Sequence, residues 1–199
     1  ISKIETTYRF SQKLIEISGG FIMQNPVQIK KNIRGKSEDF GFPLGEISGY
    51  TDKFAIEFMS KKLNDIPKSS SVFFVGRYSF DAKLLNDSGL FSCQYNNTSG
   101  FIDVKVKSRP DLNAVFLTAH KSKGLQADYV FIINNKKSRM GFPSKIQDAP
   151  ILDLLLDNCD QYPYAEERRL FYVALTRAKK KVFIVTVNGQ ESEFAMELK

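Results

Sequence analysis

Residues 115–133, VFLTAHKSKGLQADYVFII, decide the fold, because a buried strand runs into a polar turn and then into a second buried strand. Both ends are nearly continuous apolar runs, which is typical of strands covered on both faces of a sheet. Small residues in the turn, Thr118, Ser122 and Gly124, let the backbone approach a phosphate or a sugar closely. The stretch therefore predicts a ligand-binding turn in an α/β sheet. A solvated basic connection explains the same composition equally well.

Elsewhere in the chain, short runs rich in β-branched and aromatic residues alternate with longer segments that have helical spacing. This alternation predicts an α/β domain with a mostly parallel sheet flanked by helices on both faces. Ser11 is placed to cap the first helix, and Thr51 or Asp52 the second. The expected strands are 72–75, 114–118, 129–133 and 182–187, and the expected helices are 10–24, 51–64, 80–86, 151–156 and 164–179.

Three further segments have weaker patterns. Residues 35–49 and 134–149 carry Gly, Pro, Ser and charged residues without clear periodicity, and we expect them to be surface loops. Residues 91–106 are strand-like and fit either a single strand or a hairpin at the sheet edge, with the pairing left open.

Composition indicates an ordinary globular domain. The 199 residues, 42% of them hydrophobic, fit one domain with a real core. The formal net charge of +7 favours phosphate-bearing partners without choosing among nucleic acid, nucleotide and membrane surface. The sequence has no long apolar run, so we expect neither a membrane span nor a signal peptide. The chain starts at Ile1 without an initiator Met, which we interpret as the start of a fragment of a longer protein.

Cysteine usage argues against a metal site. Cys93 and Cys159 lie far apart in the sequence, with no CxxC pair and no histidine cluster beside them. We therefore expect no bound metal in this chain and a reducing, cytoplasmic compartment.

The second informative stretch is residues 166–178, EERRLFYVALTRA, in which Leu170, Val173 and Ala174 share one helical face and Phe171 and Leu175 broaden the buried side. Arg177 stands near the end of this helix, just before a strand, where a rigid helix holds its guanidinium at one edge of the sheet. That position suits an arginine finger. The alternative is that the acidic and basic residues at the start of the helix form ordinary surface ion pairs and that Arg177 complements the helix C-terminus.

Taken in order, four stretches resemble the C-terminal motifs of UvrD/Rep-type superfamily 1 DNA helicases. They are TYRF at 7–10, VGRY at 75–78, LTAHKSKGLQADYV at 117–130 and AEERRLFYVALTRAKKKV at 165–182. The sequences GLQADYVFI at 124–132 and GFP at 141–143 are most similar to those of the DNA helicase IV branch. The resemblance implies the second, C-terminal RecA-like domain of a P-loop NTPase-type helicase, occupying residues 1–199.

The resemblance implies roles at an ATP site. Tyr8 stacks on adenine, Arg9 reaches the γ-phosphate, and Arg177 is the second γ-phosphate ligand and the strongest catalytic candidate. Gly124 belongs to the turn that approaches the nucleotide. Gln126 stands where the family usually has an acidic residue that binds the ribose, and its amide can still form a hydrogen bond, but without charge.

The resemblance also implies contacts to single-stranded DNA. Thr118 and His120 are candidate DNA contacts, with Ser122 as a further candidate. Arg77 matches a motif near the DNA or the interdomain cleft, and a structural salt bridge explains it nearly as well. His120 has no partner carboxylate or nucleophile near it in sequence, so we do not expect acid–base catalysis from it.

The sequence lacks a phosphate loop and an acidic strand end that could hold magnesium. We therefore expect ATP with Mg²⁺ to be held jointly with an N-terminal RecA-like domain of the parent chain, and the isolated chain to be inactive. Residues 79–113 stand where larger relatives carry an accessory domain. The resemblance implies translocation on single-stranded DNA, 3′ to 5′.

Two other functions compete with a DNA helicase. The first is a non-enzymatic nucleic-acid-binding or interaction module with a degenerate helicase fold, which Gln126 would suit. The second is an RNA helicase or a nuclease-fused helicase, because backbone and stacking contacts do not by themselves distinguish DNA from RNA.

Overall fold

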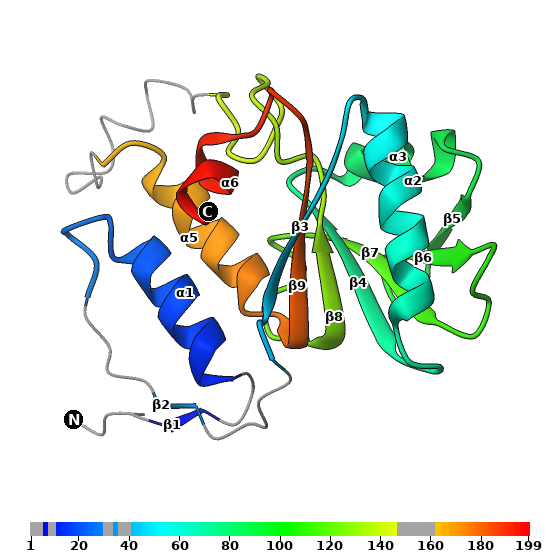
Figure 1. The fold of residues 1–199 in the computed structure, drawn as a ribbon, viewed down its shortest axis with the longest axis horizontal. Coiled ribbons are helices and arrows are strands. Elements are labelled where there is room, and N and C mark those ends of the chain that lie inside the picture. Colours follow the sequence, from blue (N-terminus) through cyan, green and yellow to red (C-terminus); the bar gives the residue numbers. More distant parts are fainter. Residues whose placement is uncertain (1–5, 8–10, 30–33, 36–40, 147–161) are drawn as a thin grey trace.

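A seven-stranded sheet with the order β3-β9-β8-β4-β7-β6-β5 runs through the centre of this computed structural model (Figure 1). The structure describes residues 6–7, 11–29, 34–35, 41–146 and 162–199. The first five strands in that order are mutually parallel, and β6 and β5 continue the sheet antiparallel. The strands are β3 (Leu44–Gly49), β4 (Ser71–Gly76), β5 (Phe91–Asn96), β6 (Phe101–Val106), β7 (Asn113–Thr118), β8 (Ala127–Ile132) and β9 (Ala178–Val187).

Helices cover both faces of the sheet, as the sequence predicts (Figure 1). The helices are α1 (Gln12–Ile22), α2 (Asp52–Lys62), α3 (Ala82–Asp87), α5 (Ala165–Leu175) and α6 (Glu193–Glu197), with short 3-10 turns at Leu63–Asp65 and Ser79–Asp81. One apolar core joins α2 and α3 to the sheet, and a second joins α1, α5 and α6 to the opposite face. Ser11 and Thr51 cap α1 and α2, each accepting a bond from the backbone three residues later.

The four expected strands and the edge hairpin are confirmed. Residues 91–106 form the hairpin β5–β6, and β6 pairs antiparallel with β7. A separate two-stranded parallel sheet joins β1 (Thr6–Thr7) to β2 (Arg34–Gly35). It lies at the end of the molecule where β8 and β9 begin (Figure 1).

Two expectations about secondary structure are wrong. Part of the expected loop 35–49 is the strand β3, which pairs with β9 along its whole length. The helix expected over 164–179 ends at Leu175, and β9 begins at Ala178. Of the residues expected on the buried side of α5, Ala174, Phe171 and Leu175 are buried, whereas Leu170 and Val173 are only half-buried, and Ala165 and Arg168 complete the buried face. The helix expected over 151–156 lies outside the described residues.

No helix within the described ranges is long and apolar enough to cross a membrane.

Candidate functional site

The candidate residues lie at the two opposite ends of the parallel strands. We call the side where these strands end the carboxyl edge and the side where they begin the amino edge. Strands β7 and β8 are both parallel to β4, so the chain leaves β7 at the carboxyl edge and enters β8 at the amino edge. Residues 119–126 make this whole crossing. Thr118 and His120 therefore lie at the carboxyl edge, whereas Gln126 and Arg177 precede β8 and β9 at the amino edge. The expectation that the turn sits at strand carboxyl ends holds only for its first half.

At the amino edge, Arg177 joins α5 to the turn before β8. Its side chain is 9% exposed. Its guanidinium donates to the carbonyl oxygens of Val173 at 2.8 Å and Leu125 at 3.2 Å, and to the hydroxyl of Thr176 at 3.1 Å. The carbonyl of Arg177 in turn accepts the amide of Ala127 at 3.1 Å. The two longest motifs of the sequence thus meet around one buried guanidinium.

Two neighbours of Arg177 complete this amino-edge cluster. Gly124 is exposed with φ of +87°, a conformation that favours glycine, and a Cβ there would meet no atom within 4 Å. The side-chain nitrogen of Gln126 is buried and has no hydrogen-bond partner among the described residues. A buried amide N–H without a partner costs free energy unless something binds it. The cluster therefore offers a donor and open space beside a fixed positive charge.

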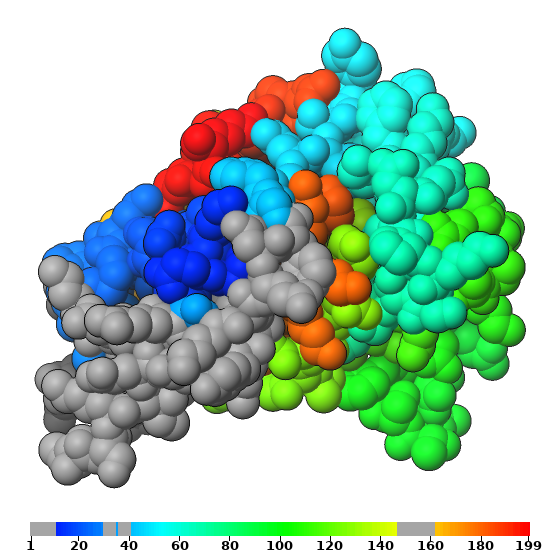
Figure 2. Space-filling model, turned by 60° about the horizontal axis from the view of Figure 1, so that its bottom comes forward, coloured from blue at the N-terminus to red at the C-terminus, as the bar shows by residue number. Residues whose placement is uncertain are grey.

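Segments at the start of β9 and in the turn before β8 reach the surface side by side, in orange and yellow-green (Figure 2). Tyr172 lies on α5, near Arg177. Burial raises the pKa of its hydroxyl, against the opposing effect of the nearby Arg177 charge. Its phenol therefore stays protonated at neutral pH.

At the carboxyl edge, the start of the same turn is held by short-range hydrogen bonds. Thr118 is half-buried, and its hydroxyl accepts the amide of Lys121 at 3.3 Å. Ser122 is fully buried, and its hydroxyl donates to the carbonyl of Ala119 at 2.7 Å. His120 is exposed. Of the three DNA candidates in this turn, Thr118 and His120 present surface, whereas Ser122 faces inward.

Arg77 follows β4 at this carboxyl edge and forms an ion pair. Its Nε donates to Glu167 at 2.7 Å, and the two side chains are 19% and 13% exposed. The other oxygen of Glu167 accepts the amide of Ser144 at 2.9 Å. The guanidinium also lies over the ring of Tyr78, 4.8 Å from its centroid. The salt bridge that the sequence left open is therefore present, and Arg77 joins β4 to α5.

The charged start of α5 is not simply a solvated face, so the expectation of ordinary surface ion pairs is wrong for two of its residues. Besides Glu167, Arg168 is 4% exposed and makes a bidentate pair with Glu197 of α6, at 2.5 and 2.8 Å. Its guanidinium lies 4.6 Å from the ring centroid of Phe21. Only Glu166 and Arg169 form the local exposed pair. Sequence reasoning missed Arg168 because its partner is 29 residues away.

Tyr8 and Arg9 lie outside the described residues. Strand β1 ends at Thr7, directly before them. In Figure 1, β1 lies at the end of the molecule where β8 and β9 begin. The segment that leads into these two candidates is thus at the same end as Arg177.

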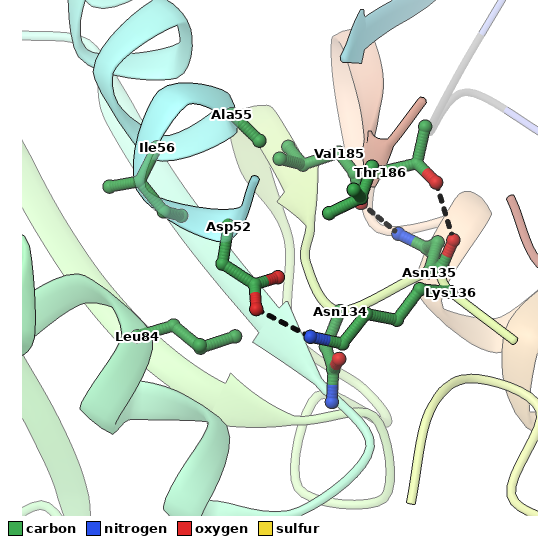
Figure 3. A pocket seen from close by; sticks show the side chains of 10 residues that line it. Asp52, Ala55, Ile56, Leu84, Asn134, Asn135, Lys136, Val185 and Thr186 are labelled. Atoms are coloured by element: carbon green, nitrogen blue, oxygen red, sulfur yellow. Dashed lines mark hydrogen bonds and ion pairs between the residues drawn. The ribbon is translucent and has the colours of Figure 1, made fainter. Parts of the chain in front are cut away.

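A small cavity lies at the carboxyl edge between α2, β9 and the segment after β8 (Figure 3). Lys136 and Asp52 face one another there, 2.5 Å apart, and Asn135 donates to the carbonyl of Val185. Its volume of about 10 Å³ holds one water molecule at most. This cavity is too small to bind a nucleotide. No group of three or more metal-ligating side chains lies within the described ranges.

The sequence is similar to those of several helicases. Residues 103–189 match the family described as the UvrD-like helicase C-terminal domain. The chain is 33% identical over 197 residues to DNA helicase IV of Escherichia coli, which covers 98% of the chain and 26% of that protein. A probable DNA helicase II homolog of Mycoplasma pneumoniae is 27% identical over 143 residues, covering 72% of the chain and 16% of that protein. The chain thus spans about a quarter or less of these relatives.

Among solved structures that match is a helicase domain of the same fold. It is the C-terminal domain of a possible DNA helicase from Lactobacillus strain WCFS1, with a TM-score of 0.54 and 13% sequence identity. The match covers 97% of this chain and 94% of that one. At this identity the likeness concerns the fold alone, and it agrees with a RecA-like α/β domain.

Proposed function

The chain belongs to the UvrD-like helicase C-terminal domain family, and we propose that it is the second RecA-like domain of an ATP-dependent DNA helicase. In this proposal residues 1–199 form one wall of a composite ATP site, and an N-terminal RecA-like domain of the parent protein supplies the other wall. The observation that carries the proposal is the bond from Arg177 to Leu125, which joins the two longest helicase-like motifs at one edge.

On the nucleotide side, Arg177 acts as the arginine finger and stabilises negative charge on the phosphoryl group in transfer. The partnerless buried N–H of Gln126 and the open space beside Gly124 fit a sugar hydroxyl and a close backbone approach. When bound, ATP with Mg²⁺ supplies the phosphoryl group, and the metal ligands belong to the other domain. Tyr8 and Arg9 complete this wall in the proposal, on the strength of the motif resemblance.

On the DNA side, Thr118 and the exposed His120 contact a single strand at the carboxyl edge. Arg77 keeps its two terminal amino groups for a phosphate, since only its Nε has a hydrogen-bond partner among the described residues. Ser122 acts differently from the first expectation. Its buried hydroxyl holds the carbonyl of Ala119 and so positions the turn that carries Thr118 and His120.

The two sides are coupled through residues 119–126, which carry a DNA contact at one end and a nucleotide contact at the other. A nucleotide that draws the amino edge toward the other domain therefore shifts the strand contacts at the opposite edge. We infer translocation on single-stranded DNA in the 3′ to 5′ direction from the family resemblance. Residues 79–113, which include the hairpin β5–β6, stand in place of the accessory domain of larger relatives.

The proposal is tested by Arg177→Ala in the full parent protein. We expect DNA-stimulated ATP hydrolysis to fall at least about 1000-fold, as for loss of an arginine finger, while binding of single-stranded DNA stays largely intact. Arg169→Ala is the matched control, since Arg169 is an arginine of the same motif, on α5, in an exposed pair with Glu166. A thermal melt of both variants separates loss of chemistry from loss of fold.

Unchanged turnover in Arg177→Ala would refute the finger assignment. A parent protein without any phosphate loop, and without hydrolysis in the wild type, would favour the rival, a non-enzymatic nucleic-acid-binding module. Measurable ATP turnover by the isolated 199-residue chain would contradict the proposal that it holds only one wall of the site.

A further inference from the structure

Besides the small cavity beside Lys136, a larger groove lies at the carboxyl edge, next to Thr118, and the proposed function does not account for it. Its volume is about 320 Å³, within the size range of small-molecule sites. It lies between the hairpin β5–β6, the end of β7 and the turn after β4. Six of its lining residues matter here: Ser79, Tyr95, Ile102, Phe116, Thr118 and Lys121.

The floor of the groove is a row of side chains that crosses three strands. Tyr95 of β5 is the register partner of Ile102 of β6, and Ile102 is the partner of Phe116 of β7. Register partners point to the same face of a sheet. The row passes from Phe116, which is 2% exposed in the α2–α3 core, to Tyr95, which is 57% exposed. The core thus continues outward into an aromatic ring that is mostly exposed.

The inner end of the groove is polar. Thr118 follows Phe116 by two residues in β7 and so shares its face. Ser79 stands at the start of the turn after β4. Lys121 donates from its ammonium to the carbonyl of Gly100 at 3.0 Å, which ties the hairpin turn to the helicase-like turn. The nearest acidic residue of the hairpin, Asp103, belongs to the other face of β6 and accepts a bond from Asn96.

We propose that this groove binds one nucleobase of single-stranded DNA, stacked on Tyr95, with the adjoining phosphate at Lys121. The inference rests on the proposed function, because it extends the strand path from Thr118 and His120 onto the hairpin.

The chemistry of the lining favours nucleic acid over an apolar protein segment. A base offers a π-face to Tyr95 and Ile102, and the phosphate beside it matches the ammonium of Lys121. The groove is continuous with Thr118, itself a proposed strand contact. Aromatic floors with a cation at the rim bind bases of any sequence, as a translocating protein requires. The net charge of +7 also attracts a polyanion.

The test combines an aromatic truncation with an abasic scan. The full chain is titrated with fluorescent oligothymidylate in which one abasic site is moved along the strand, and binding is followed by anisotropy. In the wild type we expect one abasic position to weaken binding about 5-fold or more, the loss of one stacked base. In Tyr95→Ala binding is already weakened by that factor, and the same abasic position has no further effect. Tyr95→Phe keeps the wild-type profile.

Tyr50→Ala is the matched control. Tyr50 is 79% exposed and follows β3, the edge strand on the opposite side of the sheet from β5. This variant is expected to leave the abasic profile unchanged. An unchanged profile in Tyr95→Ala, with wild-type affinity, would overturn the groove assignment and leave the proposed function standing. It would also point to a protein segment as the occupant. Absence of any strand binding by the wild-type chain would overturn both.

Discussion

The guanidinium of Arg177 donates a 3.2 Å hydrogen bond to the carbonyl oxygen of Leu125, 52 residues earlier in the chain. This bond fixes the geometry of the proposed nucleotide wall, because the end of α5 and the turn before β8 then move as one body. It also means that Arg177 has a structural role in addition to its proposed chemical one.

A stability cost is therefore expected for Arg177→Met. The substitution removes the donors to Val173 and Leu125 and leaves two part-buried carbonyls without these partners. We expect the free energy of unfolding to fall by about 2 to 4 kcal/mol, as measured by urea denaturation. Lys179→Met, two residues on and exposed, serves as the control and is expected within about 0.5 kcal/mol of the wild type. Equal stability of both variants would contradict a structural role for Arg177.

The ion pair between Arg77 and Glu167 allows two roles of Arg77 to be separated. Arg77→Ala and Glu167→Gln both break the pair, and we expect each to lower the free energy of unfolding by about 1 to 3 kcal/mol. Only Arg77→Ala is expected to weaken single-stranded DNA binding, since Glu167→Gln leaves the positive charge in place. Anisotropy titrations at two salt concentrations measure this. If both variants bind DNA equally well, Arg77 is structural alone.

A large loss of stability is expected at Arg168. Arg168 itself and its bond to the carbonyl of Phe21 are buried, and its bidentate partner Glu197 is partly exposed, so Arg168→Ala leaves a carboxylate and a buried carbonyl without their partner. We expect about 3 to 5 kcal/mol of destabilisation, with little rescue by Arg168→Lys, because an ammonium lacks the planar fork. The neighbouring exposed Arg169→Ala should cost under about 1 kcal/mol. Similar midpoints for the two alanine variants in chemical denaturation would refute this contrast.

The thiol of Cys93 on β5 is expected to react slowly. Burial raises its pKa to about 11, so the reactive thiolate is a very small fraction at pH 8. In a Cys159→Ser background, the rate with a thiol reagent is expected to climb with pH toward 11 and to rise sharply in denaturant. A rate at pH 8 equal to that of a free cysteine peptide would show that the hairpin exposes this thiol.

Much of the architecture was predictable because it depends on local patterns. The strands β4, β7, β8 and β9 are runs of apolar residues long enough to be buried on both faces, and such runs have few alternatives in a layered domain. The strand β3 was missed because its glycines were interpreted as loop residues. In the structure they mark close approaches: a Cβ on Gly45 would lie 2.6 Å from the ring of Phe183, and one on Gly49 would lie 2.4 Å from the amide of Ala55.

The candidate site was predictable in its residues and less so in its geometry. Periodicity placed Arg177 at the end of a helix, but the basic residues after it were taken for helix although they open β9. The split of the motif between two sheet edges follows from strand order, with β4 lying between β7 and β8, and no local pattern encodes that order. The pairing of Arg168 with Glu197 is likewise a long-range contact.

The eight-residue crossing from β7 to β8 has limited spare length. Six strand residues span about 20 Å, and the nine peptide steps from Thr118 to Ala127 reach about 30 Å even when fully extended. Part of that reach is spent in the hydrogen-bonded turns at Thr118 and Ser122. The segment is therefore a short, hydrogen-bonded connection between the two edges rather than a free loop. Lengthening it by a few residues is expected to uncouple nucleotide binding at the amino edge from DNA contact at the carboxyl edge, while each edge keeps its own structure.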